Sequence, residues 1–405
     1  MKILFQVGLY FSSFIYGNPP TSLMANSYSF NSEMPKEKNC QISGTIHSEG
    51  TKSIILIKPG QDWRFDPVIE IPVVDGKFYY KTKLDYPQAV QLFLGEVKEK
   101  GGGRYMNLFL ENEKMELEIF SENEFEKNKV KGGKLNAEYA RFKSEAEKIF
   151  GTRKNLLSDS LTILQKNKQY HSEEMNEVLD KINKSESQDE KIIYYKKMDN
   201  MRNAKRDKMP EAKRLSDKME AVFIEEKAFQ QNYINDHPTL VSYSFFIQNL
   251  IFQKKHVDPI NARITYKKLA GNNRNHPYNT LALDLLDAID NIKVGGQFTD
   301  FEAPDLNGQL VKLSNKIKGK IDLLDLWASW CGPCIARTKT MLPLYDEYKD
   351  KGLTIVGVAG EFKNTKNLLT FLEREKWPWL QLLELDRQNN IWQKYGVDNA
   401  GGAMF

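Results

Sequence analysis

Hydrophobic and polar positions follow three successive patterns along the 405-residue chain. In the first, over residues 38–125, short apolar runs alternate with polar positions or are rich in β-branched residues, which predicts strands. Strands are expected in the runs that begin at Ile42 and Ser53 and at Val68–Val74, Ala89–Leu94, Tyr105–Leu110 and Met115–Phe120. Asp75-Gly76 lies between two apolar runs and predicts a hairpin. Several short strands separated by turns are typical of a small antiparallel β-sandwich.

The second pattern, over residues 130–290, is helical and rich in lysine and glutamate, with little strand signal. Breaks are expected near Gly151, Pro210, His237-Pro238 and residues 271–277. An all-α region follows from this pattern. Its mixed charges are typical of solvated helix faces. A coiled-coil dimerisation arm is an alternative, although the apolar positions sustain no heptad repeat.

The third pattern, over residues 293–405, alternates strands with helices. A hairpin with its turn at Asp305–Gly308 precedes further expected elements: strands at Leu323–Trp327, Leu353–Ala359 and Leu380–Leu385, and helices from Cys331, at Thr365–Lys376 and at Asn389–Tyr395. Strands that alternate with helices predict βαβ units and an α/β fold whose mixed sheet contains parallel pairs.

The N-terminal residues 1–25 are typical of a signal peptide. Lys2 precedes an apolar stretch, Ile3–Tyr16, and Leu23–Ala25 offers a small-residue cleavage site. The apolar stretch is shorter than the roughly 20 residues that a transmembrane helix needs. Export is therefore expected, with an uncleaved anchor or a buried N-terminal strand as alternatives. A lipid anchor at Cys40 is not expected, because Glu37–Asn39 before it are polar.

Composition narrows the class of protein. Hydrophobic residues make up 40% and charged residues 28% of the chain, which is typical of a soluble globular protein. The net charge of +4 is small for this length and predicts no nucleic-acid partner. Three cysteines are too few for a disulfide scaffold. Two of them form one motif, so Cys40 is expected to be a spare thiol.

Cys331 and Cys334 form a Cys-x-x-Cys motif between an expected strand and an expected helix. This spacing places two thiols one helical turn apart, close enough to form and reopen a disulfide. Backbone N–H groups at the helix N-terminus favour the thiolate of the first cysteine. A zinc site would need a second pair of ligands. Since Cys40 and His276 are the nearest candidates before the motif, we expect a redox pair and no metal.

Residues 294–405 resemble a thioredoxin-fold domain of the TlpA/ResA-like envelope class. The resemblance rests on Phe301–Gly308, on Leu326–Cys334 and on Tyr395–Val397. Less specifically, the whole chain resembles envelope thioredoxins that carry an N-terminal β-rich domain of unassigned role and a helical middle. A complete domain of this class continues beyond Phe405, so the resemblance implies a C-terminally truncated domain.

The resemblance implies roles for the residues of the motif. Cys331 corresponds to the attacking cysteine and Cys334 to the resolving one. Asp325, six residues before Cys331, corresponds to a buried carboxylate that accepts the Cys334 proton. Trp330 is expected to shield the site. Gly332 and Pro333 are expected to tune the thiol pair.

Two positions depart from the family's pattern. Gly402 falls where thioredoxins have a cis-proline, and with Gly401 before it we expect both glycines to bind substrate. Lys339 replaces the usual helix-kinking proline, and Pro343 follows four residues later.

The expected function is that of an extracytoplasmic thiol:disulfide oxidoreductase in the periplasm or cell envelope. It is expected to reduce protein disulfides without a cofactor. The partners implied are a disulfide-containing protein substrate and a membrane or envelope electron donor. Cytochrome c maturation and peripheral membrane association are compatible with the resemblance. An envelope binding or scaffold protein, with a purely structural cysteine pair, is the alternative. A peroxidase is not expected, because the residues before Cys331 lack the peroxiredoxin approach Pro-x-x-x-Thr-x-x-Cys.

Overall fold

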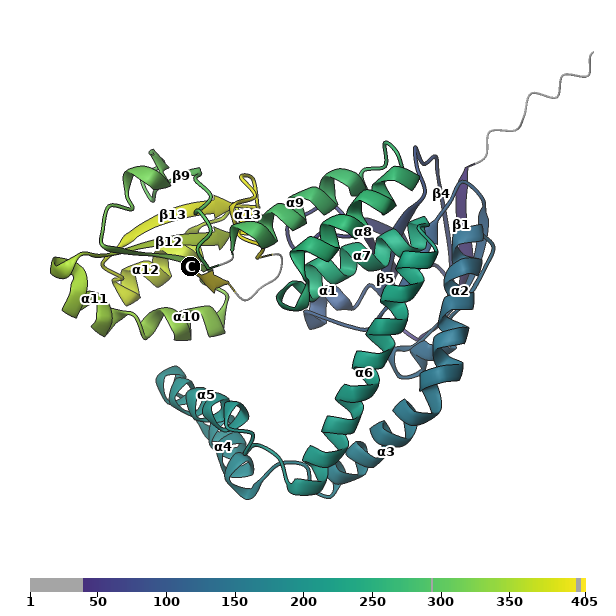
Figure 1. The fold of residues 1–405 in the computed structure, drawn as a ribbon, viewed down its shortest axis with the longest axis horizontal. Coiled ribbons are helices and arrows are strands. Elements are labelled where there is room, and N and C mark those ends of the chain that lie inside the picture. The colour runs from purple at the N-terminus through teal and green to yellow at the C-terminus, as the bar shows by residue number, and fades with distance from the viewer. Residues whose placement is uncertain (1–38, 293, 398–401) are drawn as a thin grey trace, which may run out of the picture. The chain divides into compact units, whose positions relative to one another are not determined.

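The computed structural model describes residues 39–292, 294–397 and 402–405. The expected signal peptide, residues 1–25, lies outside these ranges. Residues 40–131 form two four-stranded sheets with the strand orders β4-β1-β7-β8 and β3-β2-β5-β6 (Figure 1). The strands are β1 Cys40–His47, β2 Ser53–Ile57, β3 Ile69–Pro72, β4 Lys77–Thr82, β5 Gln88–Leu94, β6 Tyr105–Leu110, β7 Lys114–Phe120 and β8 Lys129–Lys131; the short helix α1 is Val97–Lys100.

The two sheets share one hydrophobic core. Ile42 and Met115 from the first sheet and Leu56 and Leu108 from the second are all buried in it. This arrangement confirms the N-terminal β-sheets. One pairing differs from the antiparallel prediction, since β1 runs parallel to β7. The chain crosses to the second sheet and back between these two strands, and such a crossover allows parallel pairing.

The turn at Asp75-Gly76 joins the two sheets. Both residues have positive φ, 50° and 69°, as a tight two-residue turn requires. Val74 and Lys77 pair across it, but β3 then joins β2 and β4 joins β1. The prediction of a turn is confirmed, whereas the prediction of a regular hairpin is wrong. Strands β3 and β4 are consecutive in the sequence, but each belongs to a different sheet of the sandwich.

The middle of the chain is helical, as predicted. Its helices are α2 Lys134–Ala146, α3 Thr152–Lys166, α4 Glu173–Lys184, α5 Gln188–Asn203, α6 Pro210–Asp236, α7 Leu240–Phe252, α8 Pro259–Asn272 and α9 Tyr278–Asn291. The break expected at Gly151 is wrong, because a π-helical turn, Glu147–Gly151, joins α2 to α3. Helices α3 and α6 lie side by side (Figure 1).

The second sheet of the β-sandwich is covered on its outer face by helices of the middle region. Ala89 and Phe109 share a hydrophobic cluster with Phe246 of α7 and Tyr278 of α9. The Ala89 N–H also donates a hydrogen bond of 2.9 Å to the Tyr278 hydroxyl. Strand β2 is buried on both faces by other residues. Ile54 and Leu56 lie in the core between the sheets, and Ile55 and Ile57 pack with Trp63 and Val97.

The C-terminal region contains a mixed sheet with the order β13-β12-β11-β14, in which β11–β12 and β12–β13 are parallel and β11–β14 is antiparallel. Its elements are β9 Glu302–Pro304, β10 Leu310–Lys312, β11 Ile321–Trp327, α10 Gly332–Lys339, α11 Leu342–Tyr348, β12 Leu353–Glu361, α12 Lys366–Glu375, β13 Leu380–Leu385, α13 Ile391–Lys394 and β14 Ala403–Met404. Helices α10, α11 and α12 lie along one side of the sheet (Figure 1), as two right-handed crossovers require.

Two local features complete the C-terminal region. Strands β9 and β10 form the predicted hairpin. Helix α10 ends at Lys339, and α11 begins at Leu342 with Pro343 in its first turn, so the chain bends just before the proline. Within the described ranges, no helix is both long and apolar enough to cross a membrane.

Candidate active site

Cys331 and Cys334 are joined by a disulfide at the N-terminus of α10. Cys331 is the N-cap residue, and its Sγ accepts a hydrogen bond of 3.3 Å from the Cys334 N–H. Gly332 and Pro333 form the exposed first turn of the helix, where the fixed φ of proline is favourable. Cys331 is 5% exposed and Cys334 is fully buried, so Cys331 is the sulfur nearer to solvent.

Asp325 lies in β11 and is fully buried. The Thr338 hydroxyl donates a 2.6 Å hydrogen bond to one carboxylate oxygen, and the Arg337 guanidinium lies 3.4 Å from the other. Burial raises the pKa of the Asp325 carboxyl above its ordinary value, while Thr338 and Arg337 oppose that rise. A carboxyl with a raised pKa binds a proton more tightly than an ordinary aspartate does, and it can accept a proton in catalysis.

Thr338 connects Asp325 to the cysteine pair, a role that the sequence alone did not indicate. Its hydroxyl lies 3.0 Å from the carbonyl oxygen of Cys334, four residues earlier on α10, besides contacting Asp325. The spacing contains a usable signal, because residues four apart share one helix face. A polar residue four positions after the second cysteine is therefore expected to face the strand beneath.

Glu361 is a second residue that the sequence did not single out. It ends β12, is 3% exposed, and accepts hydrogen bonds from the Ser329 N–H (2.5 Å) and hydroxyl (3.1 Å). Burial raises the pKa of the Glu361 carboxyl, and the two bonds from Ser329 oppose the rise. Glu361 therefore holds the turn that leads from β11 to Trp330. Because the carboxyl ends of parallel strands lie at the same edge of a sheet, a polar residue at the end of β12 could have been predicted to lie near the end of β11.

Gly402 lies directly beside the cysteine pair. A Cβ atom on it would lie 2.9 Å from Cys334 Sγ and closer still to the Leu326 carbonyl oxygen. Its φ of +50° is also unfavourable for other residues. The structure thus brings Gly402 to the site, while Gly401 lies outside the described residues. Substrate binding by these glycines stays a prediction.

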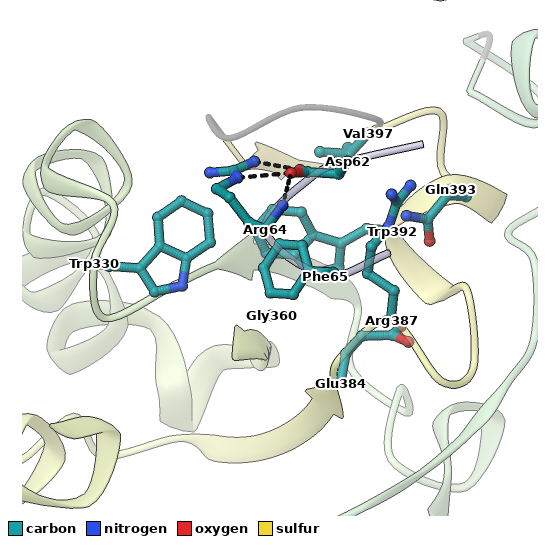
Figure 2. Close-up of a pocket in the computed structure, with 10 residues that line it drawn as sticks. All are labelled: Asp62, Arg64, Phe65, Trp330, Gly360, Glu384, Arg387, Trp392, Gln393 and Val397. Atoms are coloured by element: carbon teal, nitrogen blue, oxygen red, sulfur yellow. Dashed lines mark hydrogen bonds and ion pairs between the residues drawn. The ribbon is translucent and has the colours of Figure 1, made fainter. Parts of the chain in front are cut away.

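Trp330 forms part of the wall of a hollow of about 340 Å³ (Figure 2). Trp392 and Arg387 line the hollow from the C-terminal region, and Arg64 and Phe65 line it from the loop between β2 and β3. The hollow thus brings the loop between β2 and β3 into contact with Trp330, the residue directly before Cys331.

Cys40 lies in β1, away from the cysteine pair, and has a fully buried free thiol. Burial raises the pKa of this thiol to about 11, which keeps it protonated and unreactive at neutral pH.

Cys40→Ser should leave disulfide reductase activity within about twofold of the wild type, because a protonated buried thiol does not exchange disulfides. Insulin reduction measures this activity. A collapse of activity in a variant that still folds would show that Cys40 takes part in the redox cycle.

Comparisons with known proteins match the two ends of the described chain to two families. The AhpC/TSA family matches residues 294–404, and a domain of unknown function, DUF4369, matches residues 40–139. Together with the mixed sheet and the Cys331–Cys334 pair, the first match identifies residues 294–404 as a thioredoxin-like domain of the AhpC/TSA family.

This domain is homologous to thiol-disulfide oxidoreductases. ResA of Oceanobacillus iheyensis is 39% identical over 71 residues, covering 16% of this chain and 36% of the relative. ResA of Bacillus thuringiensis is 30% identical over 108 residues, covering 26% and 59%. The thioredoxin domain of a Bacteroides vulgatus thiol-disulfide oxidoreductase is 32% identical, covering 24% of this chain and 69% of that one, with a TM-score of 0.22. The chain thus spans between about a third and six-tenths of these curated relatives.

Proposed function

We propose that the protein reduces disulfide bonds in protein substrates outside the cytoplasm, with Cys331 and Cys334 as its redox pair. The observation that carries this proposal is the disulfide at the N-terminus of α10, which lies next to a buried carboxyl on β11. The names of the relatives, thiol-disulfide oxidoreductases, support the same reaction class. The apolar N-terminal stretch of the sequence supports export.

In the first step, the thiolate of Cys331 attacks a sulfur of the substrate disulfide. A Cys331–substrate disulfide forms, the substrate S–S bond breaks, and the released substrate thiolate takes a proton from solvent. The Cys334 N–H, which donates to Cys331 Sγ in this structure, favours the thiolate before the attack.

In the second step, Cys334 loses its proton and attacks Cys331 Sγ. The Cys331–Cys334 disulfide forms, the mixed disulfide breaks, and the second substrate sulfur leaves as a thiolate that takes a proton from solvent. Two electrons have then passed to the substrate. Asp325 accepts the Cys334 proton, with Thr338 holding the carboxyl against the helix that carries Cys334. An envelope dithiol donor must reduce the pair again before the next turnover.

The direction of electron flow follows from the Gly332-Pro333 dipeptide. The same dipeptide separates the cysteines of thioredoxin, whose potential is about −270 mV, whereas the oxidant DsbA lies near −120 mV. The difference of about 150 mV corresponds to roughly 7 kcal/mol for two electrons. A reducing potential is useful outside the cytoplasm only if a donor keeps the pair reduced, so the proposal includes such a donor.

A redox titration of the Cys331–Cys334 pair in thiol–disulfide buffers should give a midpoint near −270 mV, about that of thioredoxin. The protein should also reduce insulin with dithiothreitol as donor. A midpoint above about −180 mV would assign the pair to an oxidant or isomerase. Absence of insulin reduction, with the pair freely reducible, would favour the scaffold alternative.

A further inference from the structure

The loop between β2 and β3, residues 58–68, lies against the thioredoxin-like domain beside Cys331. Contacts of three kinds join them. The Arg64 guanidinium carbon lies 4.8 Å from the centre of the Trp330 ring. The Phe65 ring stacks on Phe362 with 4.9 Å between centres, and an Asp66 carboxylate oxygen accepts a 2.9 Å hydrogen bond from Arg387. A cation–π contact, an aromatic stack and an ion pair thus converge on one short loop.

The loop is ordered by its own hydrogen bonds. The Asp62 carboxylate accepts hydrogen bonds from Arg64 Nε (2.9 Å) and Nη2 (2.5 Å), a forked pairing that fixes the guanidinium plane (Figure 2). The Asp62 N–H donates to the Asp66 carboxylate at 2.7 Å. Trp63 packs on the buried residues Ile55 and Ile57 of the sheet below. Arg64 and Phe65 are therefore presented in one orientation, at little further entropic cost.

Trp330 depends on ring contacts for its orientation. Its indole N–H is buried and has no hydrogen-bond partner among the described residues. Arg64 packs on its ring, and Phe65 and Phe362 lie within 6.2 and 6.3 Å of it, centre to centre. The ring of the residue next to Cys331 is thus held from one side by the N-terminal β-sandwich.

The four side chains also leave aromatic surface open to solvent. Phe362 is 40% exposed, and Arg64, Phe65 and Trp330 are each partly exposed. Exposed aromatic and arginine side chains held in one orientation are typical of surfaces that bind polypeptides. Trp330 directly precedes Cys331 in the chain, so this surface begins at the residue next to the redox pair.

We propose that Arg64 and Phe65 of the β-sandwich determine substrate specificity, forming with Trp330 and Phe362 a composite surface on which the polypeptide flanking the substrate disulfide lies. This inference rests on the proposed disulfide reductase function. It gives the DUF4369 region a task at the redox site: the region favours protein disulfides over small ones, because only a protein substrate extends far enough to contact the loop.

Arg64→Ala and Phe65→Ala should each raise the KM for insulin about three- to tenfold and leave kcat within about twofold, since they remove binding surface and no reacting group. The rate with bis(2-hydroxyethyl) disulfide should fall much less than the efficiency with insulin, because that substrate has no flanking polypeptide to lie on the surface and loses only the orientation of Trp330. Arg64→Lys, which keeps the cation and loses the fork to Asp62, should be intermediate.

Arg104→Ala is the matched control. Arg104 makes a cation–π contact with Phe125, 5.7 Å from the ring centre, within the β-sandwich itself. This variant should behave as the wild type with both substrates, and thermal unfolding will show whether all variants fold. Wild-type KM in folded Arg64→Ala and Phe65→Ala would overturn the specificity role, as would an equal loss with both substrates. If the wild type itself fails to reduce insulin, the proposed function fails instead.

Discussion

Cys334→Ser should attack substrate disulfides once and then remain covalently attached to them through Cys331. The serine hydroxyl cannot displace the substrate sulfur from the mixed disulfide, so catalytic turnover should fall by about a thousandfold or more. Incubation of the variant with insulin, followed by non-reducing electrophoresis and mass spectrometry, should show the conjugate. Reduction should release intact protein and insulin chain. The same variant, exposed to envelope proteins, would identify natural substrates.

Three controls make this result specific to the proposed order of attack. Cys331→Ser should form no conjugate and show no turnover, because the buried Cys334 cannot reach a substrate on its own. The double variant Cys331→Ser/Cys334→Ser should behave in the same way, whereas Cys40→Ser should match the wild type. A conjugate on Cys334 in the Cys331→Ser variant would reverse the roles of the two cysteines. Normal turnover of Cys334→Ser would rule out the two-cysteine cycle.

Features that depend on neighbours in the sequence could be predicted from it. The strand leading to Cys331, the helix that begins there and the turn at Asp75-Gly76 all appear where their local signals lie. The burial of Asp325 also followed from local sequence, since apolar residues surround it in β11. Short-range patterns therefore predicted where the two cysteines lie in the fold and that the Asp325 carboxyl is buried.

Features that depend on packing could not be predicted. The bond from Glu361 to Ser329 requires knowing that β12 lies beside β11. The contact of Arg64 with Trp330 joins residues more than two hundred positions apart, and the local sequence around neither residue predicts it. The helix is continuous at Gly151 because one π-helical turn accommodates this residue. The low helix propensity of glycine predicts a break there instead.

Asp325→Asn should slow turnover at pH 7 by about tenfold to a hundredfold, because an amide cannot accept the Cys334 proton. The loss should shrink as pH rises, since solvent hydroxide then removes that proton directly. Stopped-flow measurement of the second step, the release of reduced substrate, will separate this effect from the first attack. Thr338→Val removes the hydroxyl that holds the carboxyl and should slow the same step by a smaller factor. Thr338→Ser keeps a hydroxyl and should restore the rate of that step.

Asp325→Asn should also stabilise the fold at neutral pH. Burial raises the pKa of the Asp325 carboxyl in the folded state, so the folded protein binds this proton more tightly than the unfolded chain does. The free energy of unfolding of the wild type should therefore fall as pH rises from the unfolded pKa through the folded one. Each unit of difference contributes about 1.4 kcal/mol. Asp325→Asn lacks this decline and keeps an acceptor for the Thr338 hydroxyl.

Urea unfolding between pH 4 and pH 8, with the Cys331–Cys334 disulfide intact, will measure this difference. The Asn variant should gain stability relative to the wild type as pH rises, although its turnover at pH 7 is slower than that of the wild type. Asp322→Asn, on the same strand, is the control, since the Asp322 side chain accepts a hydrogen bond from the Gly319 N–H and an amide oxygen can accept it equally well. A variant that is less stable at pH 7 yet turns over normally would show that Asp325 serves the fold alone. The opposite signs of the two effects would show that the buried carboxyl is kept for proton transfer at a cost in stability.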